Sequence, residues 1–210
     1  MNSSLQEKYI LPSPAGAFYC ISSKENEQAK HFLQNLMTGK ESSQFDEEKF
    51  EQDAQLLPHI QKLKLLQGFD QAVQIPEGTI EDTLPEILQK LSSESKALLA
   101  DDQGLYLAST GFTHEASEEL SALSGDLSSL YTRHQGIIKG NLNIKSSAFS
   151  LVDAAGYSQL GFWPIYIGEQ MFVLVILGVP RFDQSAFVEL VWMLHRRYFV
   201  KQEAVDSDAA

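Results

Sequence analysis

The sequence predicts an α+β protein built from amphipathic helices and short strands. Two apolar runs flank the turn-forming residues Asp101–Gly104, a long helix with one apolar stripe follows, and a meander of three strands comes next. The chain has 210 residues, of which 43% are hydrophobic, so it can bury a core of substantial size. From residue 79 onward the expected order is helix, two strands, helix, three strands and helix.

Residues 1–78 are expected to form a small, mainly helical segment, because proline and glycine interrupt the pattern near Gln74–Gly78. Its apolar run at residues 15–22 predicts a short strand. A helix is predicted over residues 25–37, with Gly39 placed to end it and with Ala29, Phe32, Leu33 and Leu36 on one face. Further helices are predicted over residues 46–54 and 56–66. Three short helices with one strand resemble a small winged-helix-like unit.

The second segment, residues 79–202, begins with a predicted helix over residues 79–95. Its apolar stripe is Leu84, Ile87, Leu88 and Leu91. Pro85 is expected within the first turn, where a missing N–H costs least. A β-hairpin follows, with Leu98 and Leu99 before the turn and Leu105 and Leu107 after it. Asp101 and Asp102 are predicted to form this turn rather than to act as paired catalytic carboxylates.

A long helix is predicted from about His114 to about Ile138. Its apolar positions follow steps of four, three, four, three and seven residues: Ala116, Leu120, Leu123, Leu127, Leu130 and Ile137. Such a stripe predicts one buried face, which either lies on a sheet as a core helix or packs against a second helix as a dimer seam. The opposite face is polar and holds Glu115, Glu118, Glu119, Asp126, Ser129 and Arg133.

A β meander and a final helix complete the second segment. Residues 141–152, 157–167 and 170–179 are predicted to form three strands, joined by turns at Asp153–Gly156 and Gly168–Glu169. The last helix is expected over residues 184–201, with Phe187, Val188, Val191, Leu194 and Tyr198 facing inward. The acidic tail, residues 203–210, is expected to be disordered.

This order of elements resembles the roadblock family of dynein-light-chain type, whose bacterial members are called MglB-like. The resemblance covers about residues 80–200 and is carried by KALLADDQGLYLASTG at residues 96–111 and EELSALSGDLSSL at residues 118–130. It implies a roadblock/profilin-like fold with a five-stranded antiparallel sheet between helices. It implies homodimers in which strand three pairs with its own copy and the two long helices lie side by side. It also implies binding to Ras-like small GTPases, as a scaffold or as a regulator.

Two surfaces are expected to bind other chains. Strand three is polar over much of its length and has a single protecting charge, Lys145, so pairing with a second copy would satisfy its exposed edge. The predicted dimer interface is Leu142, Ile144, Ser146, Ala148 and Ser150, together with Leu123, Leu127 and Leu130 of the long helix. The predicted partner-binding surface is Glu118, Glu119, Asp126, Ser129 and Arg133, whose acidic bias suits a basic patch on a GTPase.

The bulk composition excludes several classes of protein. The net charge of −12 repels phosphate backbones and argues against broad nucleic-acid binding. Cys20 is the single cysteine, so a disulfide within the chain and a thiolate metal cluster are both excluded. The first residues lack the pattern of a signal peptide, and the apolar run Met171–Val179 is too short to span a bilayer. These features predict a cytoplasmic protein that does not insert into membranes.

No motif in the sequence indicates catalysis or a cofactor. A P-loop motif is absent, His114–Glu115 lacks the second histidine of a zinc-protease motif, and the five histidines are scattered. We therefore expect a non-enzymatic protein with no metal and no cofactor. Two other functions stay open: a ligand-sensing module of the PAS or GAF kind, with a pocket lined by Phe162, Trp163 and Tyr166, and a transcriptional regulator that uses residues 1–78. The third helix of that segment offers little positive charge beyond His59, Lys62 and Lys64, which argues against DNA binding.

Overall fold

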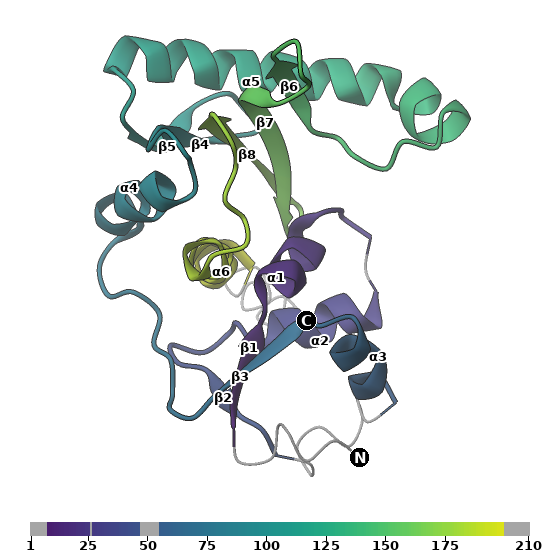
Figure 1. The fold of residues 1–210 in the computed structure, drawn as a ribbon, viewed down its shortest axis with the longest axis vertical. Helices are drawn as coiled ribbons and strands as arrows, with labels where there is room; N and C mark the ends of the chain where they lie inside the picture. The colour runs from purple at the N-terminus through teal and green to yellow at the C-terminus, as the bar shows by residue number, and fades with distance from the viewer. Residues whose placement is uncertain (1–7, 26, 47–54, 200–210) are drawn as a thin grey trace, which may run out of the picture. The chain divides into compact units, whose positions relative to one another are not determined.

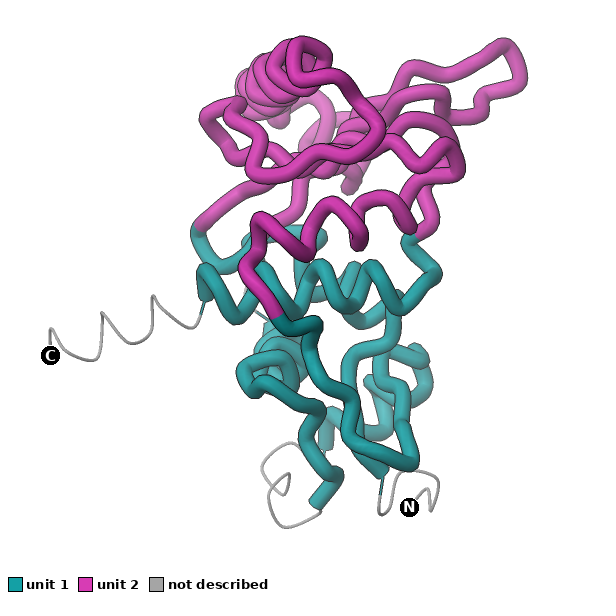
Figure 2. The backbone as a smooth tube through the Cα atoms, turned by 90° about the vertical axis from the view of Figure 1, so that its left-hand side faces the viewer, with its two compact units in different colours: residues 1–77, 167–169, 182–210 teal, residues 78–166, 170–181 magenta. Residues whose placement is uncertain are grey.

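The structure is a computed structural model that describes residues 8–25, 27–46 and 55–199 (Figure 1). The chain divides into two compact units. Unit 1 takes residues 1–77, 167–169 and 182–210, and unit 2 takes residues 78–166 and 170–181 (Figure 2). Unit 2 contains the long helix and most of the predicted interaction residues, so the candidate site lies in it.

Unit 2 is built on a five-stranded antiparallel sheet with the strand order β5-β4-β8-β7-β6, which confirms the expected number of strands. Its strands are β4 (Ala97–Asp101), β5 (Tyr106–Thr110), β6 (Phe149–Val152), β7 (Ser158–Ile167) and β8 (Gln170–Leu177). The inner strand β4 pairs on one side with β5 and on the other with the central strand β8, where Leu98 lies opposite Val175. β6 ends the sheet, and its register on β7 sets Ser150 opposite Gly161.

Two helices of unit 2 pack on this sheet. The long helix α5 (His114–Gln135) lies along the sheet in Figure 1, and α4 (Ile80–Lys90) packs against β4 and β5. The core under α5 consists of Leu98, Ala100, Phe162, Val173 and Val175, with Tyr106, Phe112, Leu120, Leu127 and Leu160 packed at its margin. The expected order of helix, two strands, helix and three strands is confirmed.

The ends of these helices follow local capping chemistry. The side chain of Thr79 accepts a hydrogen bond from the backbone N–H of Asp82, and that of Thr113 accepts one from Ala116. The helix α4 ends at Lys90, short of the predicted residue 95. Pro85 lies inside α4 rather than in its first turn, so that part of the prediction was wrong.

The described residues of unit 1 contain a second, smaller sheet and four α-helices. The sheet has the order β2-β1-β3, with β1 at Tyr9–Pro12, β2 at Ser43–Gln44 and β3 at Leu66–Phe69. The helices are α1 (Pro14–Ile21), α2 (Gln28–Asn35), α3 (Leu57–Lys62) and α6 (Ser185–Leu194), which continues as the π-helical turn η3 (His195–Phe199). The helix predicted over residues 46–54 falls almost wholly outside the described residues. The winged-helix-like character of this segment stays a prediction.

The strand predicted at residues 15–22 is wrong, because these residues form α1. Ser13 accepts a hydrogen bond from the N–H of Gly16 at 3.1 Å, and Pro14 occupies the first helical position. Serine at the N-cap and proline after it are the standard signals of a helix start, and they outweigh the apolar run that suggested a strand. β3 was also missed, because Lys64 adopts a left-handed φ of 55° that ends α3 and lets residues 66–69 pair with β1.

Strand three is much shorter than the predicted residues 141–152. After α5 the chain continues in the π-helical segment η2 (Gly136–Asn141), and the N–H groups of Leu142 and Ile144 donate to the carbonyls of Ile137 and Ile138. Asn143 takes a left-handed φ of 52°. These contacts keep residues 141–144 out of the sheet, so β6 consists of Phe149–Val152 alone.

The compact units differ from the expected segments in one respect. Sequence analysis assigned the last helix to residues 79–202, whereas the structure groups residues 182–210, which contain α6, with unit 1. The indole N–H of Trp192 in α6 donates to the carbonyl of Gly39 at 3.0 Å, and Phe187 lies against Phe18 of α1 with ring centroids 6.3 Å apart. Contacts alone do not test independent folding, so the boundaries at residues 78, 79 and 202 stay predictions. The tail at residues 203–210 lies outside the described residues.

Candidate functional site

The buried residues of α5 are serines, and Leu120 and Leu127 pack beside them at the margin of the core. Ser117, Ser121 and Ser124 are buried, and Ser128 follows with the same spacing and is half-buried. Their hydroxyls donate to backbone carbonyls one turn earlier on the helix: Ser117 to Thr113, Ser121 to Glu118, Ser124 to Ser121 and Ser128 to Ser124. The hydroxyl groups are thereby satisfied without leaving the helix, so this polar face can be buried at low cost.

Small residues on α5 allow a close approach to the hairpin between β4 and β5. Gly104 has a left-handed φ of 80°, and a Cβ atom there would lie 3.1 Å from the carbonyl oxygen of Ser121. The hairpin turn is closed by Asp101, whose side chain accepts hydrogen bonds from the N–H groups of Gln103 and Leu105 at 3.0 and 2.9 Å. This confirms that Asp101 forms the turn.

The prediction that the leucine stripe of α5 is its buried face was wrong for three of its six members. Leu123, Leu130 and Ile137 leave 41%, 42% and 55% of their side chains exposed, while Leu120 and Leu127 pack at the margin of the core. Because the serines already occupy the side toward the sheet, the leucines at seven-residue spacing are turned outward. We call Leu123, Leu130 and Ile137 the outer stripe.

The outer stripe continues into further exposed apolar residues near the end of the sheet. Leu142, Ile144, Leu151 and Val152 are all exposed, and Leu151 leaves 63% of its side chain open. Tyr131 of α5 meets Phe149 of β6 edge to face, with ring centroids 6.5 Å apart, which ties this part of the helix to the end strand. Within the described residues the outer edge of β6 has no strand beside it. An exposed strand edge next to apolar side chains is typical of an interface between chains.

Of the five dimer residues predicted on strand three, only Ser150 lies in strand β6. Ser150 lies in β6, and its hydroxyl donates to that of Ser158 at 2.8 Å. Leu142, Ile144, Ser146 and Ala148 lie in the connection before β6. They therefore do not form the strand edge that the sequence suggested, although Leu142 and Ile144 are exposed beside it.

The predicted partner-binding residues are all exposed on α5: Glu118, Glu119, Asp126, Ser129 and Arg133. With Glu115, α5 carries four carboxylates, three in its first half and Asp126 just past the middle, and the basic residues Arg133, His134 and Lys139 follow near its end and in η2. We call Glu115, Glu118, Glu119 and Asp126 the acidic patch. Its use as a partner surface stays a prediction.

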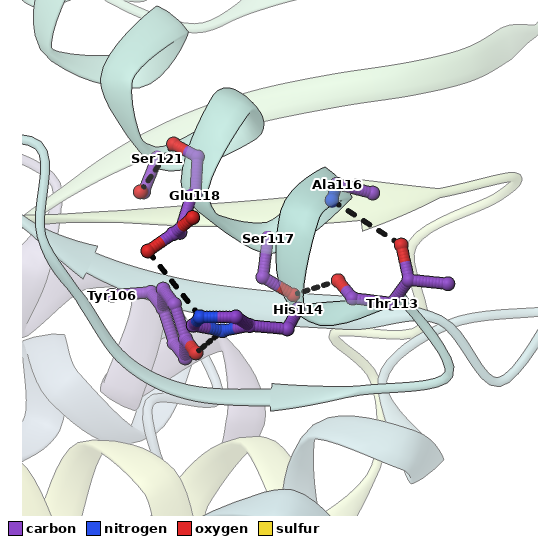
Figure 3. A network of polar contacts seen from close by, with 7 residues as sticks. All are labelled: Tyr106, Thr113, His114, Ala116, Ser117, Glu118 and Ser121. Atoms are coloured by element: carbon purple, nitrogen blue, oxygen red, sulfur yellow. Dashed lines mark hydrogen bonds and ion pairs between the residues drawn. The ribbon is translucent and has the colours of Figure 1, made fainter.

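A polar network organises the start of the acidic patch (Figure 3). The hydroxyl of Tyr106 on β5 lies 2.7 Å from Nδ1 of His114, and Nε2 of the same imidazole lies 3.4 Å from a carboxylate oxygen of Glu118. Next to this network, the hydroxyl oxygens of Ser109 and Ser117 lie 2.7 Å apart and share a hydrogen bond. His114 and Glu118 are exposed while Tyr106 is half-buried at the margin of the core, so the network links the acidic patch to the sheet.

The ligand pocket expected from Phe162, Trp163 and Tyr166 is not assembled. Successive residues of a strand point to opposite faces of its sheet, so Phe162 and Trp163 of β7 lie on different sides. Phe162 belongs to the core under α5, whereas the ring of Trp163 covers Gly161, where a Cβ atom would come within 2.1 Å of it. Burial raises the pKa of Tyr166, which is on the same face as Phe162.

Residues 8–25, 27–46 and 55–199 contain no group of three or more histidine, cysteine, aspartate or glutamate side chains that could hold a metal ion. Within the same residues no helix combines the length and apolar character needed to cross a bilayer.

The comparisons with known proteins give one structural likeness. No family model and no curated protein matches the chain. Among solved structures, the chain is similar to the Roadblock/LC7 domain from Streptomyces avermitilis, with a TM-score of 0.34 and 12% identity over 57% of this chain and 92% of that one. A likeness with a TM-score below 0.5 establishes neither a family nor a function for this protein.

Proposed function

We propose that the protein is a non-enzymatic interaction module that forms homodimers and binds a Ras-like small GTPase or its complex. The observation that carries the proposal is the outer stripe of α5 beside the unpaired edge of β6. The leucine and isoleucine side chains of this stripe are 41–55% exposed and recur every seven residues. Packing against a second helix would remove these apolar side chains from water.

The homodimer is the first part of the proposal. The end strand β6 and the outer stripe lie on neighbouring parts of unit 2, so one symmetric contact would cover both. Light scattering at micromolar concentration should give the mass of two chains. Leu130→Glu should give a monomer with an unchanged circular dichroism spectrum, because it places a charge in the seam and removes little core. A wild-type monomer would contradict this part.

The GTPase is the second part, and its class comes from the sequence resemblance to the roadblock family. The acidic patch supports a partner with a basic surface, because opposite charges speed encounter and orient the two proteins. The partner should bind near the start of α5, around Glu118 and Glu119.

The test of the second part uses purified Ras-like GTPases from the same organism, each loaded with GDP or with a non-hydrolysable GTP analogue. Calorimetry should detect binding to at least one of them. The double charge reversal Glu118→Lys with Glu119→Lys should weaken that binding about tenfold or more and reduce its salt dependence, while light scattering still shows a dimer. Asp102→Lys, a charge reversal in the hairpin turn, is the matched control. Equal affinity of the double variant and the wild type would place the partner elsewhere.

A further inference from the structure

The charges beside the outer stripe of α5 are arranged so that the helix complements a reversed copy of itself. Leu130 is the centre of the stripe, with Leu123 seven residues before it and Ile137 seven residues after it. Reversal about Leu130 exchanges Leu123 with Ile137. The same reversal brings Asp126, four residues before the centre, to the level of Arg133 and His134, which are three and four residues after it.

Asp126 and Arg133 also lie on the same side of the stripe. At 100° per residue, a position four residues before Leu130 and a position three residues after it are both rotated to one flank of the helix. When two antiparallel helices are related by a twofold axis between them, a given flank of one helix lies next to the same flank of the other. The carboxylate of each copy would therefore meet the guanidinium of the other, and the contact would occur twice.

Neither of these two charges forms an ion pair with another described residue. Asp126 and Arg133 are both exposed, and neither takes part in an ion pair with another residue in the described part of the chain. They are seven residues apart on one helix, about 10.5 Å along its axis, so they do not pair with each other. The two groups are available to a second chain.

We propose that two copies of α5 pack antiparallel across a twofold axis at Leu130, with Asp126 of each copy paired with Arg133 of the other. This inference rests on the proposed homodimer and adds its register. It assigns both Asp126 and Arg133 to the dimer seam, so that neither residue is part of the surface left for the GTPase. The occupant of the outer stripe is a second copy of this chain, because the charge pattern is self-complementary only when reversed.

Cysteine crosslinking tests the register directly. A residue on a twofold axis meets its own copy, so Leu130→Cys should form a disulfide-linked dimer under mild oxidation. Leu123→Cys should not crosslink to itself, because its own copy would be about 21 Å away along the helix. Leu123→Cys mixed with Ile137→Cys should give the crosslinked heterodimer. Wild type is the control, because Cys20 is buried and its burial raises the thiol pKa to about 12.

Each other crosslinking result overturns the inference. If Leu123→Cys and Ile137→Cys each crosslink to themselves, the helices run parallel. If Leu130→Cys fails to crosslink while light scattering shows a dimer, the axis lies elsewhere and the proposed homodimer stands. If the wild type is a monomer, both the register and the homodimer are wrong.

A charge exchange provides a second measurement that does not depend on cysteine. Asp126→Arg and Arg133→Asp should each raise the dimer dissociation constant about tenfold in sedimentation equilibrium at low salt, because each sets like charges together twice. The variant carrying both changes should return to within about threefold of wild type, since the exchanged pair is restored. Glu118→Arg, the same charge change away from the seam, should leave the constant unchanged. The pairing would be contradicted if the single variants left the dimer dissociation constant unchanged. It would also be contradicted if the double variant dimerised more weakly than either single variant.

Discussion

At the scale of the residue, glycine positions decide how closely backbone segments approach. Gly16 in α1 lies against the carbonyl of Leu65, where an added Cβ atom would be 2.0 Å from the oxygen. That carbonyl also accepts the N–H of Ser13 at 2.9 Å, so it cannot move away without loss of a hydrogen bond. The contact joins the start of α1 to the end of α3.

Gly16→Ala should lower the free energy of unfolding by about 1–3 kcal/mol, although alanine favours helices, because the methyl group collides with backbone rather than with a movable side chain. Gly140→Ala is the control, because a Cβ atom there has no neighbour within 4 Å. Urea unfolding of both variants checks the difference. Equal stability of Gly16→Ala and wild type would show that the α1 contact can relax freely.

A buried histidine makes unit 1 sensitive to acid. His195 is 1% exposed and stacks on Phe199 with ring centroids 4.3 Å apart, and its Nε2 has no hydrogen-bond partner among the described residues. Burial, with a smaller contribution from His31, lowers its pKa from 6.5 to about 4. The folded chain thus keeps the imidazole neutral at a pH where the unfolded chain has protonated it.

Stability should therefore fall as the pH is lowered from about 6.5 to about 4, and His195 should account for roughly 2–3 kcal/mol of that loss. Urea unfolding at pH 7.0, 5.5 and 4.5 measures the loss. His195→Leu should flatten the pH dependence in this window, whereas His114→Leu, at an exposed histidine, should leave it unchanged. A His195→Leu variant as acid-sensitive as wild type would refute the assignment.

At the scale of the element, α5 has two apolar edges with different roles. Leu127 packs at the margin of the core, whereas Leu123 belongs to the exposed outer stripe. From the sequence alone, both leucines belong to one stripe that is predicted to be buried. The structure separates the two.

Leu127→Ala should destabilise the fold by about 1–3 kcal/mol at every protein concentration, because the lost contacts are within one chain. Leu123→Ala should have little effect in dilute solution and a growing effect as the concentration rises, because its contacts exist only in the proposed dimer. Thermal unfolding between about 1 and 100 μM distinguishes the two. If Leu123→Ala lowered thermal stability equally at every protein concentration, Leu123 would belong to the core of the single chain.

At the scale of the whole molecule, unit 1 is assembled from distant parts of the sequence. Its N-terminal residues pack with α6 through Phe18, Phe187 and Trp192, so the segment 1–78 lacks part of its core when it stands alone. The sequence suggested that this segment is a separate unit, and a fragment can decide the matter.

A fragment of residues 1–78 should be unfolded by circular dichroism. A chain that joins residues 1–77 to residues 182–210 through a flexible linker of about 15 residues should regain helix and a cooperative transition. Trp192 is its single tryptophan, because Trp163 is removed, so blue-shifted emission would report the contact with Gly39. Cooperative unfolding of the 1–78 fragment would instead show that the segment folds on its own.

The sequence by itself determined the order of elements in unit 2 and the local chemistry of their ends. The side chains of Thr79, Thr113 and Asp101 accept hydrogen bonds from backbone N–H groups two to four residues further along the chain. Such local contacts follow from short sequence patterns. The sheet of five strands followed from apolar runs bounded by turn residues. An apolar run alone predicts a strand at residues 15–22, whereas the N-cap at Ser13 and the proline after it start a helix there.

The tertiary structure alone decided which face of α5 is buried and which unit contains α6. A stripe of leucines indicates burial in general, but α5 approaches the hairpin so closely that a Cβ atom on Gly104 would meet its backbone, and the buried residues of α5 are serines that satisfy their own hydroxyls. Ser117, Ser121, Ser124 and Ser128 repeat at steps of four, three and four, a helical spacing that is present in the sequence but is carried by polar residues. The place of α6 depends on contacts such as Trp192 with Gly39, 153 residues apart. Apolar periodicity shows that a helix has a face to bury, and long-range packing selects the surface that covers it.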